Sequence, residues 1–151
     1  MTKRSSAPGS GLLYGLYQKR LRRELAGLGE QALPKHVAMI IDGNRRWARL
    51  NALDSVSHGH RAGAAKMHEF LEWCDDLGVG VVTLYLLSND NVRKRDAAEL
   101  SDLIEIIAGL AGRLSRRGDW RVQHVGRVDG LPDFLVGALR DAEQRTSENG
   151  G

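Results

Sequence analysis

The chain has 151 residues, of which 42% are hydrophobic and 27% are charged, so we expect one soluble globular domain. No apolar run reaches the roughly 18 residues that a membrane span needs, and no secretory signal is recognisable, so we expect a cytoplasmic location. A single cysteine, Cys74, excludes an intramolecular disulfide framework. The net charge of +3 and the pI near 9.3 favour an anionic partner such as a phosphate, a nucleic acid or an acidic lipid.

The N-terminal part of the sequence divides into a leader and a helix. Residues 1–11 are rich in serine and glycine and lack periodicity, which predicts a disordered leader. From residue 12 to residue 28 apolar residues recur at three- and four-residue spacing, which is typical of an amphipathic helix, and we assign 12–32 to this helix and a linker. Packing of this helix against the rest of the protein is the favoured interpretation, and contact of its basic residues with anionic lipid at a membrane surface is the alternative.

Strands and helices alternate in the remaining sequence, 33–151. The patterns predict strands at 36–41, 79–87 and 120–126, and helices at 60–77, at about 97–114 after a capping pair of Asp96 and Glu99, and from Pro132 onward. The strand at 36–41 is continuously apolar, which favours burial on both faces. This order predicts an α/β fold, an open parallel sheet flanked by helices. We expect the fold to be truncated after the third strand and its helix, because three strands make a thin sheet.

Polar residues follow the first strand abruptly. In open α/β sheets ligands bind beyond the carboxyl ends of strands, where Asp42, Gly43 and Asn44 stand. Gly43 allows a sharp turn, and Arg46 can give paired hydrogen bonds to phosphate oxygens. A carboxylate beside a phosphate is repelled unless a cation lies between them, so Asp42 suggests Mg²⁺. The alternative is a capped turn in which Arg46 forms only a surface ion pair.

Two later segments carry similar groups. His58, His60 and Arg61 surround Gly59 just before the first helix of the domain, which suits an anion better than zinc. The second strand ends in Ser88–Asn91, followed by the basic run Arg93–Arg95. Neither GxGxxG nor GxxxxGK[ST] is present, so a dinucleotide or P-loop enzyme is disfavoured.

Three ordered motifs, HVAMIIDGNRRWA, GHRAGAAK and TLYLLSNDN, resemble those of the cis-prenyltransferases, the family of undecaprenyl and decaprenyl diphosphate synthases. Arg45 stands where many members have glycine, and Leu86, Leu87 and Ser88 replace a phenylalanine-serine pair. Both features look more like the short-chain actinobacterial Z-farnesyl diphosphate synthases. The resemblance extends from about Leu33 to the end of the sequence.

The resemblance implies a Z-prenyl diphosphate synthase that condenses isopentenyl diphosphate with an allylic diphosphate, either geranyl or farnesyl diphosphate. It implies a magnesium-dependent transferase of isoprenoid biosynthesis that pairs as a homodimer or with a homologue. Asp42 would hold Mg²⁺ and assist departure of diphosphate, and Asn91 would share the catalytic role. The implied diphosphate-binding residues are Gly43, Asn44, Arg45, Arg46, His60, Arg61 and Ser88, with Trp47, Lys94 and Arg95 as further candidates. The growing hydrocarbon needs an apolar tunnel, for which Ala64, Met67, Leu71 and residues 100–114 are candidates, with ordinary core packing as the alternative.

The sequence departs from the family pattern in several places. Val92 replaces a large aromatic residue of longer-chain members, and the basic run is out of register by one, which leaves open whether Lys94 or Arg95 takes the place of the family's arginine. The segment that binds isopentenyl diphosphate in the family is not in this sequence, so we expect little activity from the chain alone. A non-catalytic diphosphate-binding partner of a full-length homologue is the alternative. Nucleic-acid binding is disfavoured, because the basic residues do not line one helix with interleaved aromatics.

Overall fold

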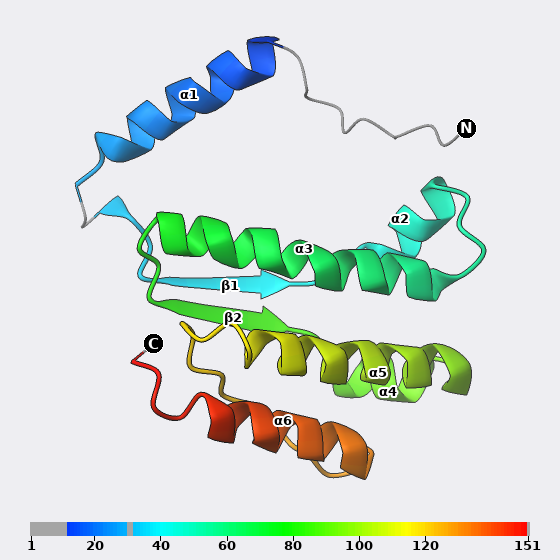
Figure 1. Cartoon of the computed structure of the whole chain (residues 1–151). Coiled ribbons are helices and arrows are strands. Elements are labelled where there is room, and N and C mark those ends of the chain that lie inside the picture. Colours follow the sequence, from blue (N-terminus) through cyan, green and yellow to red (C-terminus); the bar gives the residue numbers. More distant parts are fainter. Residues whose placement is uncertain (1–11, 30–31, 151) are drawn as a thin grey trace. The chain divides into compact units, whose positions relative to one another are not determined.

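The computed structural model describes residues 12–29 and 32–150, and the chain divides into two units, Met1–Pro34 and Lys35–Gly151. In the first unit, α1 spans Leu12–Ala26 (Figure 1), which confirms the predicted helix; Arg20 Nε lies 2.8 Å from Glu24 Oε1 one turn later. The predicted leader, 1–11, lies outside the described residues. Contact of α1 with lipid stays a prediction. Among the described helices, none is both long and apolar enough to cross a bilayer.

The second unit contains a parallel sheet and five helices among its described residues. Strand β1 (His36–Ile40) pairs with β2 (Val81–Tyr85), with Val37 opposite Val82 and Met39 opposite Leu84. This pairing confirms an open parallel α/β arrangement and both predicted strands. The helices are α2 (Asn44–Leu50), α3 (Val56–Asp76), α4 (Asn89–Lys94), α5 (Ala97–Leu114) and α6 (Asp133–Arg145).

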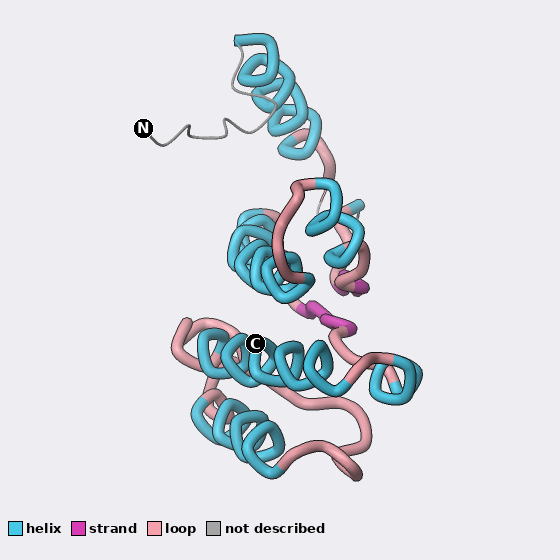
Figure 2. Tube along the Cα trace, turned by 90° about the vertical axis from the view of Figure 1, so that its right-hand side faces the viewer, coloured by secondary structure: helices cyan, strands magenta, loops and turns pink. Residues whose placement is uncertain are grey.

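One face of the sheet is packed and the other is open within this unit. Val37, Met39, Val82 and Leu84 pack on a core from α3 and α5 that includes Met67, Phe70, Cys74 and Leu110. Figure 2 shows these two helices on the same side of the strands. The alternate strand residues are exposed, among them Ile40 (72%) and Tyr85 (51%). The prediction that the first strand is covered on both faces is therefore wrong for this unit, because α6 packs on α5 rather than on the second face.

The predicted third strand is absent among the described residues. Backbone donors of this segment bond to side chains of the last helix instead of to a neighbouring strand: Val122 N donates to Thr146 Oγ1 (2.9 Å) and His124 N to Glu143 Oε1 (2.6 Å). Val125 is 92% exposed, whereas Trp120 at the start of the segment packs against the core. A β-type pattern forms a strand only where a partner strand offers a hydrogen-bond ladder, and α6 takes that place here.

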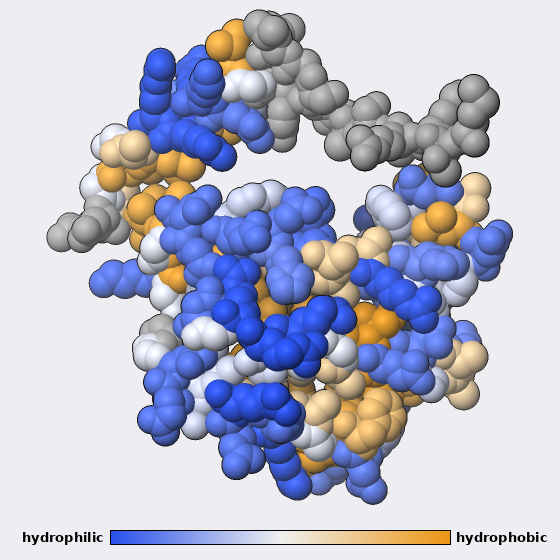
Figure 3. All heavy atoms as spheres, viewed as in Figure 1, coloured by the Kyte–Doolittle hydropathy of each residue, from blue (hydrophilic) through white to orange (hydrophobic). Residues whose placement is uncertain are grey.

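The remaining helices follow from their sequence patterns. Asp96 caps α5, because its Oδ1 accepts from Glu99 N at 2.8 Å, as predicted. Leu103, Ile104 and Ile107 on α5 form a second core with Leu135 of α6. Hydrophilic side chains predominate over α3 on the face drawn in Figure 3, as expected for an amphipathic helix.

Burial and the neighbouring Asp75 carboxylate raise the pKa of the Cys74 thiol, which keeps that core residue neutral.

Candidate functional site

The site begins in the sharp turn that links β1 to α2. Gly43 has φ +86°, a left-handed conformation that favours glycine. Asp42 Oδ1 accepts a hydrogen bond from Gly43 N at 2.6 Å, which fixes the carboxylate at the start of α2. Trp47 N donates to Gly43 O at 2.8 Å and closes the first helical turn. The turn therefore places Asp42 and the side chains of Asn44–Arg46 at the carboxyl edge of the sheet.

Two glycines of α3 allow α2 to pack directly on it. A Cβ at Gly59 would lie 2.2 Å from the carbonyl oxygen of Asn44 and 3.1 Å from Ala48 Cβ. A Cβ at Gly63, one turn later, would lie 2.6 Å from Asn44 Oδ1. Ala48 is 1% exposed in this contact. The glycines of the GHRAG motif thus form a seat for Asn44, which sets the position of the turn that carries Asp42.

The opposite wall comes from the segment after β2. Ser88 caps α4, because its Oγ accepts from Asn91 N at 3.0 Å. Arg95 lies at the junction of α4 and α5, and its backbone N–H bonds to Asn91 O at 3.1 Å. Its side chain is only 14% exposed, whereas Lys94 pairs with Asp90 at the surface at 2.7 Å. Arg95, and not Lys94, is directed to the site.

A buried ionic cluster joins this wall to α3. Glu99 Oε1 contacts Arg95 Nη1, lies 3.2 Å from His60 Nε2 and 3.6 Å from Arg45 Nε. The side chains of His60 and Glu99 are 4% and 8% exposed. Three residues earlier on α3, Ser57 Oγ donates to Asp102 of α5. These two buried polar contacts hold α3 and α5 together where both helices border the site.

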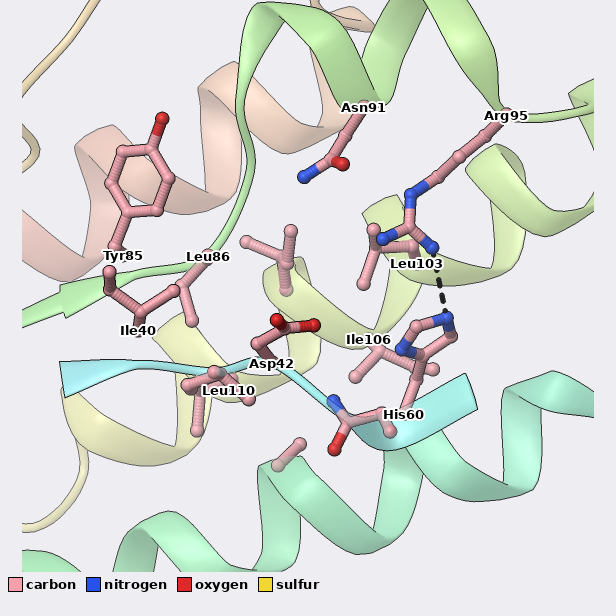
Figure 4. A pocket seen from close by; sticks show the side chains of 14 residues that line it. Ile40, Asp42, His60, Tyr85, Leu86, Asn91, Arg95, Leu103, Ile106 and Leu110 are labelled. Carbon is pink, nitrogen blue, oxygen red and sulfur yellow. Dashed lines mark hydrogen bonds between the residues drawn. The ribbon is translucent and has the colours of Figure 1, made fainter. Parts of the chain in front are cut away.

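Two cavities adjoin at the carboxyl edge of the sheet. The first, of about 290 Å³, is mainly polar, and we call it the polar cavity. The second, of about 250 Å³, has a mixed lining in which apolar residues outnumber polar ones, and we call it the apolar cavity. Five residues line both cavities: Ile41, Asp42, Asn44, His60 and Arg95. The polar cavity adds Gly43, Arg45, Arg46 and Arg49, and the apolar one adds Asn91 with Ile40, Ala64, Tyr85, Leu86, Leu103, Ile106, Ile107 and Leu110. Figure 4 shows Asp42 and Asn91 directed into the apolar cavity, with His60 Nε2 3.2 Å from Arg95 Nη1 at one side.

The predicted site residues divide into two groups. Those that line a cavity are Asp42, Gly43, Asn44, Arg45, Arg46, His60, Asn91 and Arg95. Arg61, Ser88, Trp47 and Lys94 line neither cavity: Arg61 is exposed, Ser88 is used as a cap, Trp47 is 46% exposed and Lys94 pairs with Asp90. Of the tunnel candidates, Ala64 and four residues within 100–114 line the apolar cavity, namely Leu103, Ile106, Ile107 and Leu110. Met67 and Leu71 are buried elsewhere.

Sequence reasoning missed Arg49 and the contacts of Glu99. Arg49 lies four residues after Arg45 and on the same side of α2, so a helix assigned to 44–50 would have indicated it. The capping pair with Asp96 predicts a role for Glu99 only at the helix start, whereas its spacing of four residues from Arg95 is that of a helical ion pair.

The donor set fits Mg²⁺ only if a ligand completes it. No group of three or more His, Cys, Asp or Glu side chains that could hold a metal occurs in residues 12–29 and 32–150. Asp42 is the only carboxylate among the residues lining either cavity. Mg²⁺ is commonly held by one or two carboxylates together with substrate phosphates and water, so a single carboxylate suits a metal that binds with a diphosphate.

Comparison with known proteins identifies the family. A family model described as putative undecaprenyl diphosphate synthase matches residues 40–151. The chain is 46% identical over 140 residues to isoprenyl transferase 1 of Tropheryma whipplei, covering 93% of this chain and 52% of the relative. It is 48% identical over 139 residues to (2Z,6E)-farnesyl diphosphate synthase of Thermobifida fusca, covering 92% of this chain and 53% of the relative. It is 44% identical over 135 residues to a short-chain Z-isoprenyl diphosphate synthase of Mycobacterium leprae, covering 89% of this chain and 51% of the relative.

The chain spans about half the length of the curated relatives it matches. The match includes the turn after β1, the glycine seat on α3 and the segment that carries Arg95, because all three lie within residues 40–151. By this match, which the motifs had indicated, the chain belongs to the undecaprenyl diphosphate synthase family of prenyltransferases.

Proposed function

We propose that this chain binds an allylic prenyl diphosphate, with the diphosphate in the polar cavity and the hydrocarbon in the apolar one. As part of a Z-prenyl diphosphate synthase, it would condense this primer, geranyl or farnesyl diphosphate, with isopentenyl diphosphate. The observation that supports the proposal is the junction of the two cavities at Asp42, His60 and Arg95. A prenyl diphosphate has the same division into a charged head and an apolar tail.

The charges around the polar cavity match a diphosphate. Arginines 45, 46, 49 and 95 line it and can give paired hydrogen bonds to phosphate oxygens. Bond breaking at the allylic carbon builds negative charge on the departing diphosphate, and fixed guanidinium groups stabilise that charge. Mg²⁺ held by Asp42 would add Lewis-acid stabilisation of the same oxygens. Asn91, at the boundary with the apolar cavity, would orient the reacting end of the primer.

A substitution that fills the apolar cavity should weaken binding of the hydrocarbon tail and leave binding of the diphosphate head unchanged. Ile106→Trp is expected to weaken farnesyl diphosphate binding by at least about tenfold, because an indole would occupy much of a cavity of about 250 Å³. The affinity for inorganic pyrophosphate should change less than about twofold, because Ile106 does not line the polar cavity. Titration calorimetry with both ligands in Mg²⁺ measures the two effects.

Ile106→Val is the matched control, because it removes only one methylene and leaves the cavity open. We expect this variant to bind both ligands as the wild type does. Equal loss of both ligands in Ile106→Trp, with the fold retained by circular dichroism, would contradict the separation of head and tail sites.

We also propose that condensation requires a second polypeptide segment, because the relatives are about twice as long as the matched region. That segment would lie in a longer form of this chain or in a homologue paired with it as a dimer. Mixing the chain with an inactive full-length homologue that retains its isopentenyl diphosphate site tests this. Restored turnover supports a paired catalytic role, and binding without turnover under all conditions supports the non-catalytic partner.

A further inference from the structure

From the contacts of Glu99 we infer that this buried carboxylate is a positioning residue, which holds His60 and Arg95 in the wall of the polar cavity before a ligand arrives. The inference rests on the proposed function, because it assigns to that cavity a diphosphate ligand. Glu99 itself lines neither cavity. It would therefore act through the side chains that do.

One carboxylate oxygen of Glu99, Oε1, makes all three contacts of the cluster. Oε1 contacts Arg95 Nη1 and lies 3.2 Å from His60 Nε2, while Arg45 Nε is 3.6 Å away. The backbone N–H of Glu99 is fixed by the Asp96 cap at 2.8 Å, so the first turn of α5 sets where the carboxylate stands. The carboxylate thus connects α2, α3 and the junction before α5 at a single point.

The charges explain why a carboxylate is needed there. Arg95 and Arg45 repel each other, and the side chain of Arg95 is only 14% exposed, so water screens it poorly. Glu99 supplies the negative charge that allows these cations to converge without a ligand. Because the groups are already ordered, a diphosphate would bind without first ordering them, which raises its affinity.

The contacts of His60 give a second, independent way to test whether Glu99 positions the ring. Nε2 lies 3.2 Å from both Glu99 Oε1 and Arg95 Nη1. Arginine can only donate, so Nε2 either donates to Glu99 or accepts from Arg95, but cannot do both. If Glu99 positions the ring, Nε2 carries the proton. Nδ1, which is buried and has no hydrogen-bond partner among the described residues, is then the acceptor of the neutral ring.

The first test compares two charge-neutralising variants of α5. Glu99→Gln is expected to weaken binding of inorganic pyrophosphate by at least about tenfold in calorimetry with Mg²⁺. Glu105→Gln is the control: it removes the same charge from the same helix, at an exposed position that lines neither cavity, and should change the affinity less than about twofold.

A double-mutant cycle with Arg95→Met separates positioning from a general loss of stability. If Glu99 acts by holding Arg95, Glu99→Gln should weaken binding much less in the Arg95→Met background than in the wild type. The same full loss in both backgrounds would overturn the inference, as would equal affinities of Glu99→Gln and Glu105→Gln. If the wild type binds neither pyrophosphate nor farnesyl diphosphate, the proposed function fails as well.

A measurement on the wild type keeps the inference testable if Glu99→Gln does not fold. Nitrogen-15 spectra of the histidine rings, assigned through a His60→Gln variant, report which ring nitrogen is protonated in the free protein. We expect His60 with a protonated Nε2 whose hydrogen exchanges slowly with solvent. An unprotonated Nε2 would mean that the ring accepts from Arg95, and Glu99 would not be what holds it.

Discussion

Gly59→Ala is expected to abolish diphosphate binding and to lower the free energy of unfolding by about 1–3 kcal/mol. The added Cβ would lie 2.2 Å from the carbonyl oxygen of Asn44, which is backbone and cannot rotate away. The start of α2 must therefore move off α3 and displace the turn that carries Asp42 and Arg46. Chemical denaturation gives the stability, and calorimetry with pyrophosphate and Mg²⁺ gives the affinity.

Two other glycines serve as comparisons. Gly137→Ala lies within α6 with nothing within 4 Å of the added Cβ, so it should raise the stability by about 0.4–1 kcal/mol and leave binding unchanged. Gly63→Ala would meet the side chain of Asn44, which can rotate, so a smaller loss of stability than for Gly59→Ala is expected. Unchanged pyrophosphate affinity in Gly59→Ala would show that close packing of α2 on α3 is not needed for the site.

Asp42→Asn is expected to remove the dependence of diphosphate binding on Mg²⁺. In the wild type, Mg²⁺ should strengthen pyrophosphate binding by at least about tenfold, because a metal held by Asp42 would offset the repulsion between the carboxylate and the phosphates. The variant keeps an oxygen that can accept from Gly43 N, so the turn should survive while the charge is lost. Without Mg²⁺ the variant should bind pyrophosphate more tightly than the wild type, because the repulsion between carboxylate and phosphate is gone.

Asp54→Asn is the control for this change, because Asp54 is an exposed acid between α2 and α3 that lines neither cavity. It should bind pyrophosphate as the wild type does, with and without Mg²⁺. Retention of the full Mg²⁺ effect in Asp42→Asn would show that another group holds the metal.

Local patterns in the sequence were sufficient for the elements that depend on local interactions. The stripe with Met67 and Cys74 predicted α3, although the helix begins at Val56 and not at residue 60, so that His58 and Gly59 lie within it. Asp96 predicted the start of α5 through a hydrogen bond to a residue three positions later. The strand expected at 120–126 depended on a partner strand, and the sequence could not show that Thr146 and Glu143 would take its backbone donors. The open face of β1 was missed for a similar reason, since it depends on where α6 packs.

The site shows the same division between local and distant interactions. Asp42, Gly43 and Asn44 were predicted because a polar turn after a buried strand has a known place in parallel sheets. The choice between Lys94 and Arg95 required the structure, because it depends on how α4 ends and α5 begins. The contacts of Glu99 with His60 and Arg45 join residues that lie 39 and 54 positions apart, and no sequence spacing indicates them.

We propose that the two adjoining cavities together hold one prenyl diphosphate. Amide spectra of the nitrogen-15-labelled chain, titrated in Mg²⁺ with pyrophosphate and separately with farnesyl diphosphate, test it most directly. Both ligands should shift residues 42–49 saturably, and only farnesyl diphosphate should also shift residues 103–110 of α5. Farnesyl diphosphate shifts that leave residues 103–110 unchanged, or that do not saturate, would contradict the claim.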